Sequence, residues 1–340
     1  MGSLTTTRQW VLAKRPSGIP DKDTFALEEK PLPDMGEGQV KVRVTDFSLD
    51  PGMRPALSRD TYVGATPIGA LITSAGLGVV EESADEKLKP GDIVSGGFGW
   101  QSALVAKGRH CVKHDPALFQ GKVTKTAAIG ILGIPGMTSW FGLKEIARLK
   151  EGETVLISSA SGPVGATAGQ LARLKGAGRV VGIAGSKAKC DWLTGEAGFD
   201  ACINYHDTDD LAAAMTDATN GGADIYFDNV GGEILDAAIT VLKPGGRIAV
   251  SGQLSEYNRD EPHGIRNTLP FITHRLTMQG FVVLDFVRDF GTAAIQMVQW
   301  INEGKLLFRE EIIDGIENAP EAYAGLFTGD NFGRRLIHVG

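Results

Sequence analysis

The most informative stretch of the sequence is TVLISSASGPVG at residues 154–165. It begins with apolar and β-branched residues, as a buried strand does, and passes through a turn into a Gly-Pro pair where a helix can begin. The turn matches the dinucleotide-binding fingerprint, with Ala160 in the first glycine position. Gly162 lets a pyrophosphate approach the backbone, and Gly165 lets the helix pack closely on the strand. We therefore expect Ala160, Gly162, Val164 and Gly165 to contact a dinucleotide at the helix N-terminus.

The residues about 20 positions further on indicate which dinucleotide is bound. NAD-binding proteins usually present an acid there to the adenosine ribose, but this sequence reads GIAGSKAK at residues 182–189. Ser186 and the lysines at 187 and 189 are candidate ligands for the 2′-phosphate that distinguishes NADP. Two lysines also fit a solvated helix face. Because the acid is missing, the sequence favours NADPH as cofactor.

Strand-like and helix-like segments alternate around this stretch, which is typical of βαβ units. We expect an α/β protein with a six-stranded, doubly wound parallel sheet of the Rossmann type. The predicted strands are residues 154–158, 179–183, 201–204, 225–228, 247–251 and 278–283. The predicted helices are residues 164–174, 187–194, 210–219, 232–242 and 289–302.

The chain has 340 residues, whereas single cores stop growing at about 250 to 300 residues, so we expect two domains. Residues 9–122 contain short alternating runs broken by Pro and Gly, which indicates a β-rich domain. The stretch 306–339 is too short to form a domain alone. We expect a substrate domain from residues 1–122 and 305–340, a Rossmann domain from 123–304, and catalysis in the cleft between them.

The net charge is −7, and the sequence has neither a long basic run nor an apolar run of about 20 residues. We expect a soluble cytoplasmic protein that binds a small molecule and neither nucleic acid nor membrane. The three cysteines, Cys111, Cys190 and Cys202, form no Cys-x-x-Cys pair. We expect them to be reduced, ordinary thiols.

Many two-domain dehydrogenases of this layout bind zinc, but no zinc site is predicted here. In the first domain only His110, Cys111 and His114 are candidate ligands, and they are crowded into one segment without an acidic pair upstream. A surface turn is the simpler explanation of that segment. Without a metal, hydrogen bonds must polarise a substrate oxygen, and Tyr257 is a candidate donor.

Several ordered motifs resemble those of one family, the zinc-independent medium-chain dehydrogenases/reductases, which includes prostaglandin, 2-alkenal and curcumin reductases. The resemblance runs from about Val40 to the C-terminus. It is carried by the fingerprint and by SLDPGMR at 48–54, GMTSWFG at 136–142, FDNVGG at 227–232, SEYN at 255–258, FVV at 281–283 and GDNFG at 329–333. It implies a GroES-like substrate domain and NADPH-dependent reduction of a carbon–carbon double bond conjugated to a carbonyl. It also implies a homodimer joined near residues 277–283.

The resemblance assigns roles to individual residues. It implies that Lys189 and Tyr205 hold the 2′-phosphate together with Ser186, and that Tyr257 lies near the nicotinamide ribose and the substrate oxygen. A structural hydrogen bond is the alternative role for Tyr257. The remaining residues that it places at the cofactor are Thr138, Asn229, Asn331 and the backbone of Phe281 to Val283.

Two departures from the family bear on the choice of substrate. The family commonly has tyrosine where this chain has Gly52 and Trp140, and loss of the first ring would widen a pocket. Met53 and Tyr62 are candidate pocket residues, although an ordinary loop tyrosine also explains Tyr62. Two other functions fit the same sequence: a quinone reductase, and a non-catalytic NADPH-binding sensor or structural protein.

Overall fold

The computed structural model describes residues 4–340, which divide into two compact units. The second unit is continuous, Gly130–Arg309, and the first combines the chain up to Ile129 with the returning segment Glu310–Gly340. Within residues 4–340, no helix is both long and apolar enough to cross a membrane.

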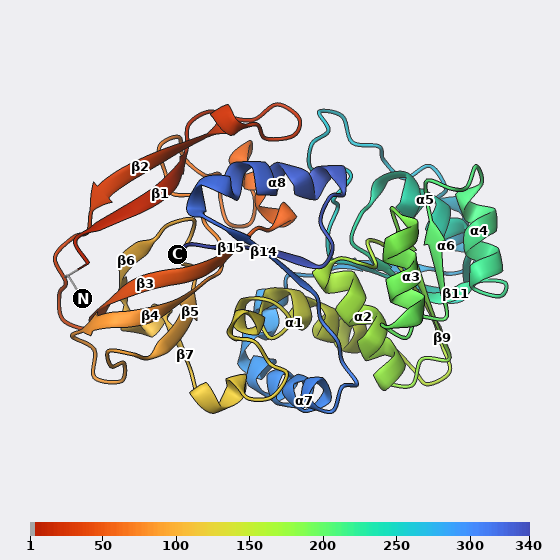
Figure 1. Cartoon of the computed structure of the whole chain (residues 1–340). Coiled ribbons are helices and arrows are strands. Elements are labelled where there is room, and N and C mark those ends of the chain that lie inside the picture. Colours follow the sequence, from red (N-terminus) through yellow and green to blue (C-terminus); the bar gives the residue numbers. More distant parts are fainter. Residues whose placement is uncertain (1–3) are drawn as a thin grey trace. The chain divides into compact units, whose positions relative to one another are not determined.

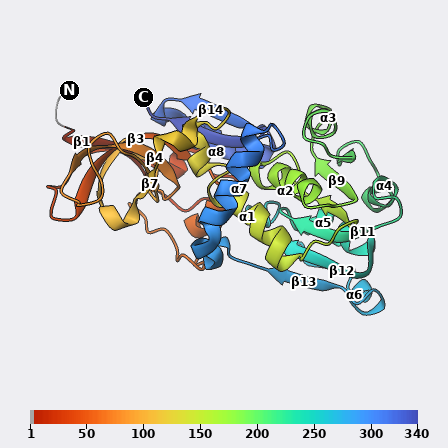
Figure 2. The same ribbon diagram turned by 90° about the horizontal axis from the view of Figure 1, so that it is seen from below.

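The second unit is built on a six-stranded sheet whose strand order is β10-β9-β8-β11-β12-β13. Every pairing in it is parallel, which confirms the doubly wound α/β class. Figure 2 shows β9, β11, β12 and β13 following one another across this sheet. The strands are β8 (Thr154–Ile157), β9 (Arg179–Ala184), β10 (Ala201–Asn204), β11 (Ala223–Asp228), β12 (Leu242–Val250) and β13 (Thr277–Gly280).

Helices cover both faces of this sheet because its strands are apolar on both sides. Leu156 of β8 and Tyr226 of β11 point to one face, where they pack with residues of α4 and α5. Phe227 points to the other face, and its ring lies against Gly142 at the end of α1. The helices are α1 (Ile134–Phe141), α2 (Pro163–Leu174), α3 (Lys187–Gly195), α4 (Leu211–Ala218), α5 (Gly232–Thr240), α6 (Leu269–Thr273) and α7 (Phe290–Asn302).

The last predicted strand, residues 278–283, is wrong at its C-terminal end. β13 stops at Gly280, and Val283 already begins the 3₁₀ helix η8 (Val283–Asp289). The β-branched and aromatic run suggested a longer strand, but the ring of Phe281 packs on Gly142 and draws the chain away from the sheet. The backbone of Phe281 to Val283 is therefore a loop and the start of a helix.

The first unit contains a seven-stranded sheet in the order β14-β15-β3-β4-β5-β7, with β6 paired to β3, and a separate β1–β2 hairpin. Figure 1 shows the returning segment, in blue, lying along β3, and the register pairs Ile337 of β15 with Phe47 of β3. Its strands are β1 (Thr6–Leu12), β2 (Phe25–Pro31), β3 (Gln39–Ser48), β4 (Gly76–Ser83), β5 (Ile93–Gly96), β6 (Ala103–Lys107), β7 (Val112–His114), β14 (Glu310–Asp314) and β15 (Arg334–His338).

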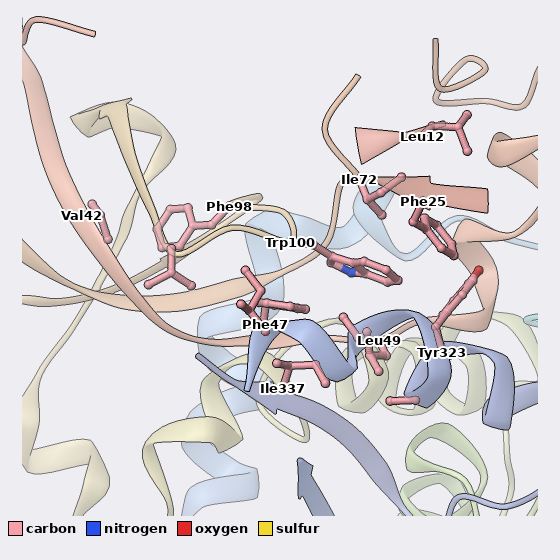
Figure 3. Packing of buried hydrophobic residues seen from close by; sticks show 14 of the residues in the cluster. Leu12, Phe25, Val42, Phe47, Leu49, Ile72, Phe98, Trp100, Tyr323 and Ile337 are labelled. Atoms are coloured by element: carbon pink, nitrogen blue, oxygen red, sulfur yellow. The ribbon is translucent and has the colours of Figure 1, made fainter. Parts of the chain in front are cut away.

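The core of the first unit is centred on Trp100, which is fully buried (Figure 3). The ring of Trp100 lies 5.2 Å from that of Phe25 and 5.4 Å, edge to face, from that of Tyr323. Such aromatic pairs contribute about 0.5 to 1.5 kcal/mol beyond the apolar area that they bury. Tyr323 belongs to α8 (Ala319–Thr328), so these contacts hold the returning segment to the N-terminal strands.

Candidate functional site

The turn between β8 and α2 has the close packing that its glycines predict. Ser159 adopts a left-handed φ of 48°, and Ala160 is fully buried. A Cβ on Gly165 would lie 2.4 Å from the carbonyl oxygen of Ser159 and 2.7 Å from the Cα of Ala160. Only glycine allows this approach of helix to turn.

The N-terminus of α2 is open to an anionic ligand. Gly162 is the N-cap residue and provides no side-chain cap, and Pro163 follows it with no N–H to satisfy. Gly162, Pro163 and Val164 are all half-buried, so the first turn is accessible. Free backbone N–H groups and the helix dipole favour a phosphate at such a position. Ser139 of α1 donates a hydrogen bond to the carbonyl of Val164 at 2.8 Å and so holds the first turn of α2 in place.

Asn229 joins the carboxyl ends of three neighbouring strands. Its Nδ2 donates to the carbonyl of Ser158 at 2.7 Å, and its backbone N–H donates to the Ser158 hydroxyl at 2.9 Å. Its Oδ1 accepts from the Ser251 hydroxyl at 2.5 Å. The ends of β8, β11 and β12 are thus locked together next to the fingerprint turn. In open α/β sheets, ligands bind outside the carboxyl ends of the strands.

Asp228 lies beneath this arrangement and is fully buried. Its Oδ1 accepts hydrogen bonds from the Tyr226 hydroxyl at 2.9 Å, from Gly231 N at 3.0 Å and from Val230 N at 3.1 Å. Its Oδ2 has no hydrogen-bond partner among residues 4–340. Burial raises the pKa of Asp228, and burial together with the neighbouring carboxyl raises that of Tyr226 well above its ordinary value.

No role was predicted from the sequence for Asp228, Ser158 or Ser251. A signal for Asp228 was present, because an acid ends the mostly buried strand β11, and buried acids are rare unless they are hydrogen-bonded. The two serines carried no such signal, since their partners come from other strands.

The loop after β12 brings Tyr257 to the same edge of the sheet. The Ser255 hydroxyl donates to the carbonyl of Val230 at 2.8 Å, and Leu254 N donates to the carbonyl of Asn229 at 3.2 Å. The hydroxyl of the half-buried Tyr257 accepts a hydrogen bond from Gln253 N at 3.2 Å. A phenol can both accept and donate a hydrogen bond.

The predicted 2′-phosphate residues follow the ends of the neighbouring strands β9 and β10. The Ser186 hydroxyl caps α3 by accepting from Lys189 N at 3.3 Å. The Tyr205 hydroxyl lies 2.9 Å from the position that a Cβ on Gly185 would take, so it covers the residue before the cap. Lys187 is exposed and paired with Asp191, one turn along the same helix, at 2.7 Å. This pair fits the solvated-face interpretation for Lys187.

The other predicted residues of the second unit lie on α1 and after β13. Thr138 of α1 donates to the carbonyl of Ile134 at 2.8 Å, and Val283 is buried at the start of η8.

The three remaining residues belong to the first unit. Met53 packs against its hydrophobic core, and Asn331 Nδ2 donates to the carbonyl of Gly333 at 3.2 Å. Tyr62 is 78 % exposed, as an ordinary loop tyrosine would be.

The expectation of three ordinary thiols is wrong. Cys190 of α3 and Cys202 of β10 form a disulfide, with their Cα atoms 5.2 Å apart. Cys111 is a free thiol whose pKa is raised to about 11 by burial and by Asp85.

Among residues 4–340 there is no group of three or more His, Cys, Asp or Glu side chains that could hold a metal ion. His114 in particular is hydrogen-bonded to the Ser95 hydroxyl at 2.7 Å, and burial lowers its pKa.

Two family models match the chain. One is described as the N-terminal domain of oxidoreductase and matches residues 8–114; the other, described as zinc-binding dehydrogenase, matches residues 163–300. The second description implies zinc, and the described residues do not fit that ion.

Curated relatives match over almost the whole chain. An NADPH-dependent curcumin reductase of Escherichia coli is 40 % identical, over 98 % of this chain and 96 % of the relative. An NADP-dependent 2-alkenal reductase of Nicotiana tabacum is 37 % identical, over 100 % of this chain and 99 % of the relative. The crystal structure of CurA from Vibrio vulnificus in complex with NADPH has a TM-score of 0.91 and 35 % identity, over 98 % of this chain and 99 % of that chain.

Proposed function

The chain belongs to the medium-chain dehydrogenase/reductase family, and from this membership we propose that it reduces the carbon–carbon double bond of α,β-unsaturated aldehydes and ketones without zinc. It is an NADPH-dependent oxidoreductase. The name of the tobacco relative, 2-alkenal reductase, supports the substrate class, because a 2-alkenal is an α,β-unsaturated aldehyde.

One observation carries the proposal: the Tyr257 hydroxyl lies in a loop that is hydrogen-bonded to Asn229 and Val230. In our proposal the pyrophosphate lies on the N-terminus of α2, beside the glycines of the fingerprint. Ser186, Lys189 and Tyr205 hold the 2′-phosphate, and Asn229 lines the path towards the nicotinamide. Thr138, Phe281 and Val283 complete the second unit's cofactor contacts, and Asn331, Met53 and Tyr62 are the first unit's candidates.

When bound, NADPH supplies the hydride that reaches the β-carbon of the substrate. Negative charge then grows on the substrate's carbonyl oxygen. The Tyr257 hydroxyl donates a hydrogen bond to that oxygen, and the bond strengthens as the charge develops. Solvent or the hydroxyl network supplies the proton for the α-carbon.

The test is NADPH oxidation with four groups of substrates: 2-alkenals, cyclic enones, aromatic enones and simple quinones. We expect turnover of enals or enones, with the saturated carbonyl compound as product. Turnover of quinones alone would assign the protein to the quinone reductases. NADPH binding without oxidation by any of the four groups would make it a non-catalytic cofactor-binding protein.

We also propose that the protein is a cytoplasmic homodimer joined along β13. This edge strand is mostly exposed, and α6 beside it exposes Leu269 and Ile272 by 67 % and 76 %. An unpaired edge with apolar neighbours is suited to pairing with a second copy. Light scattering in solution tests it, and a monomer at micromolar concentration would contradict it.

A further inference from the structure

The disulfide joins α3, which carries Lys189, to β10, which ends one residue before Tyr205. Cys190 directly follows Lys189 on α3, and Cys202 precedes Tyr205 by three residues at the end of β10. The covalent link therefore joins the residue next to the lysine to the strand that leads to the tyrosine.

The rest of α3 is held by packing further along the helix. Trp192 and Leu193 are buried, whereas Lys187 and Ala188 in the first turn are exposed. The Ser186 hydroxyl caps this end of α3, and the disulfide ties Cys190 covalently to β10. Because Trp192 and Leu193 anchor the middle of α3 by their burial, we expect opening of the disulfide to loosen the first turn and to leave the helix in place.

β10 is secured independently of the disulfide. It pairs in parallel with β9, with Cys202 opposite Gly182, and Tyr205 N donates to the carbonyl of Ala184 at 3.2 Å. We therefore expect opening of the disulfide to leave the sheet intact and to change mainly the distance and orientation of the α3 first turn relative to Tyr205.

We propose that the Cys190–Cys202 disulfide is a specificity-determining element that holds Ser186 and Lys189 in register with Tyr205 for recognition of the cofactor's 2′-phosphate. This inference rests on the proposed function's assignment of those three residues. A dithiol reductant opens the bond: two electrons and two protons pass to the cysteines, which become thiols, and the reductant becomes a disulfide. In reducing compartments, disulfides are rare and usually transient, so this bond makes NADPH preference dependent on redox state.

The test measures dissociation constants for NADPH and NADH by fluorescence titration, which needs no substrate. The wild type is compared before and after treatment with a dithiol, and Cys190→Ser/Cys202→Ser is compared with the control Cys111→Ser. We expect reduction to weaken NADPH binding about tenfold, the effect of losing one charge-assisted hydrogen bond, and to leave NADH binding within about twofold. The double variant should have the dissociation constants of the reduced wild type, and the dithiol should not change them. Cys111→Ser should behave as wild type.

Lys189→Ala distinguishes the assignment of the 2′-phosphate site from the proposed role of the disulfide. If it weakens NADPH binding and reduction does not, the disulfide has no role in specificity although the 2′-phosphate site is correct. If neither change alters the preference for NADPH, the assignment of the site itself fails. An equal loss of both cofactors, or free thiols at 190 and 202 in oxidised protein by alkylation and mass spectrometry, would also overturn the inference.

Discussion

Tyr257 is the residue to which we assign direct contact with the reacting substrate, and its removal gives the first prediction. Tyr257→Phe should keep the fold and NADPH affinity and lower kcat by about tenfold to a thousandfold, since one such donor contributes up to about 4 kcal/mol. The variant removes the phenol oxygen that accepts from Gln253 N, but this hydrogen bond is exposed, so a water molecule can accept in its place.

Single-turnover hydride transfer with deuterated cofactor is the measurement, because slow product release would hide the effect in the steady state. An unchanged transfer rate would leave Tyr257 with a structural hydrogen bond only.

Asp228 gives a second prediction, on stability. Burial raises its pKa, so its contribution to stability is greatest below the ordinary value of 3.8 and is lost as the pH rises through the higher folded-state value. Asp228→Asn keeps an oxygen for Gly231 N and Tyr226 but cannot ionise. The difference in free energy of unfolding, Asp228→Asn minus wild type, should therefore increase as the pH rises from below 3.8 to neutral.

Urea unfolding at a series of pH values measures this difference, with Asp228→Ala as the comparison. The alanine variant leaves the Tyr226 hydroxyl and two backbone N–H groups without an acceptor, and should lose about 3 kcal/mol at neutral pH. Parallel pH curves for wild type and Asp228→Asn would show that the buried carboxyl does not titrate as we argue.

Among the elements, the βα turn at β8 gives the third prediction. Alanine is normally favoured over glycine within a helix by about 1 kcal/mol, but a Cβ on Gly165 would lie 2.4 Å from the Ser159 carbonyl. Gly165→Ala should therefore destabilise the protein by about 1 to 3 kcal/mol and weaken NADPH binding, as α2 shifts from the turn.

Gly195→Ala is the matched control, because a Cβ there, at the end of α3, has nothing within 4 Å. Thermal unfolding and cofactor titration compare the two variants. If both variants unfold and bind NADPH alike, the close approach of helix and turn does not explain why residue 165 is glycine.

The elements also show how far the sequence could predict the structure. The β8–turn–α2 unit was predicted to within a residue, because strand periodicity, Gly and Pro all indicate the same boundary there. The end of β13 was not, since packing of the Phe281 ring on Gly142 overrides a run of strand-forming residues. The disulfide could not be predicted either: its cysteines are 12 residues apart on different elements, and only the packing of α3 against β10 brings them together.

At the scale of the whole molecule, the fourth prediction follows from the absence, among residues 4–340, of a set of side chains that could bind a metal ion. Purified protein should contain less than stoichiometric zinc by elemental analysis and should keep its activity in a strong chelator, because residues 4–340 offer no set of three ligands. One tightly bound zinc per chain, lost together with activity, would contradict the metal-free chemistry proposed for Tyr257.

The insertion of β15 between β14 and β3 has a consequence for biosynthesis. As the chain leaves the ribosome, all six strands of the Gly130–Arg309 unit have been made before β14 appears. The N-terminal strands, although made first, cannot complete their sheet until Arg334–His338 has emerged. The edge of β3 at residues 46–48 therefore stays unpaired until β15 has been made, and until then it is open to wrong partners.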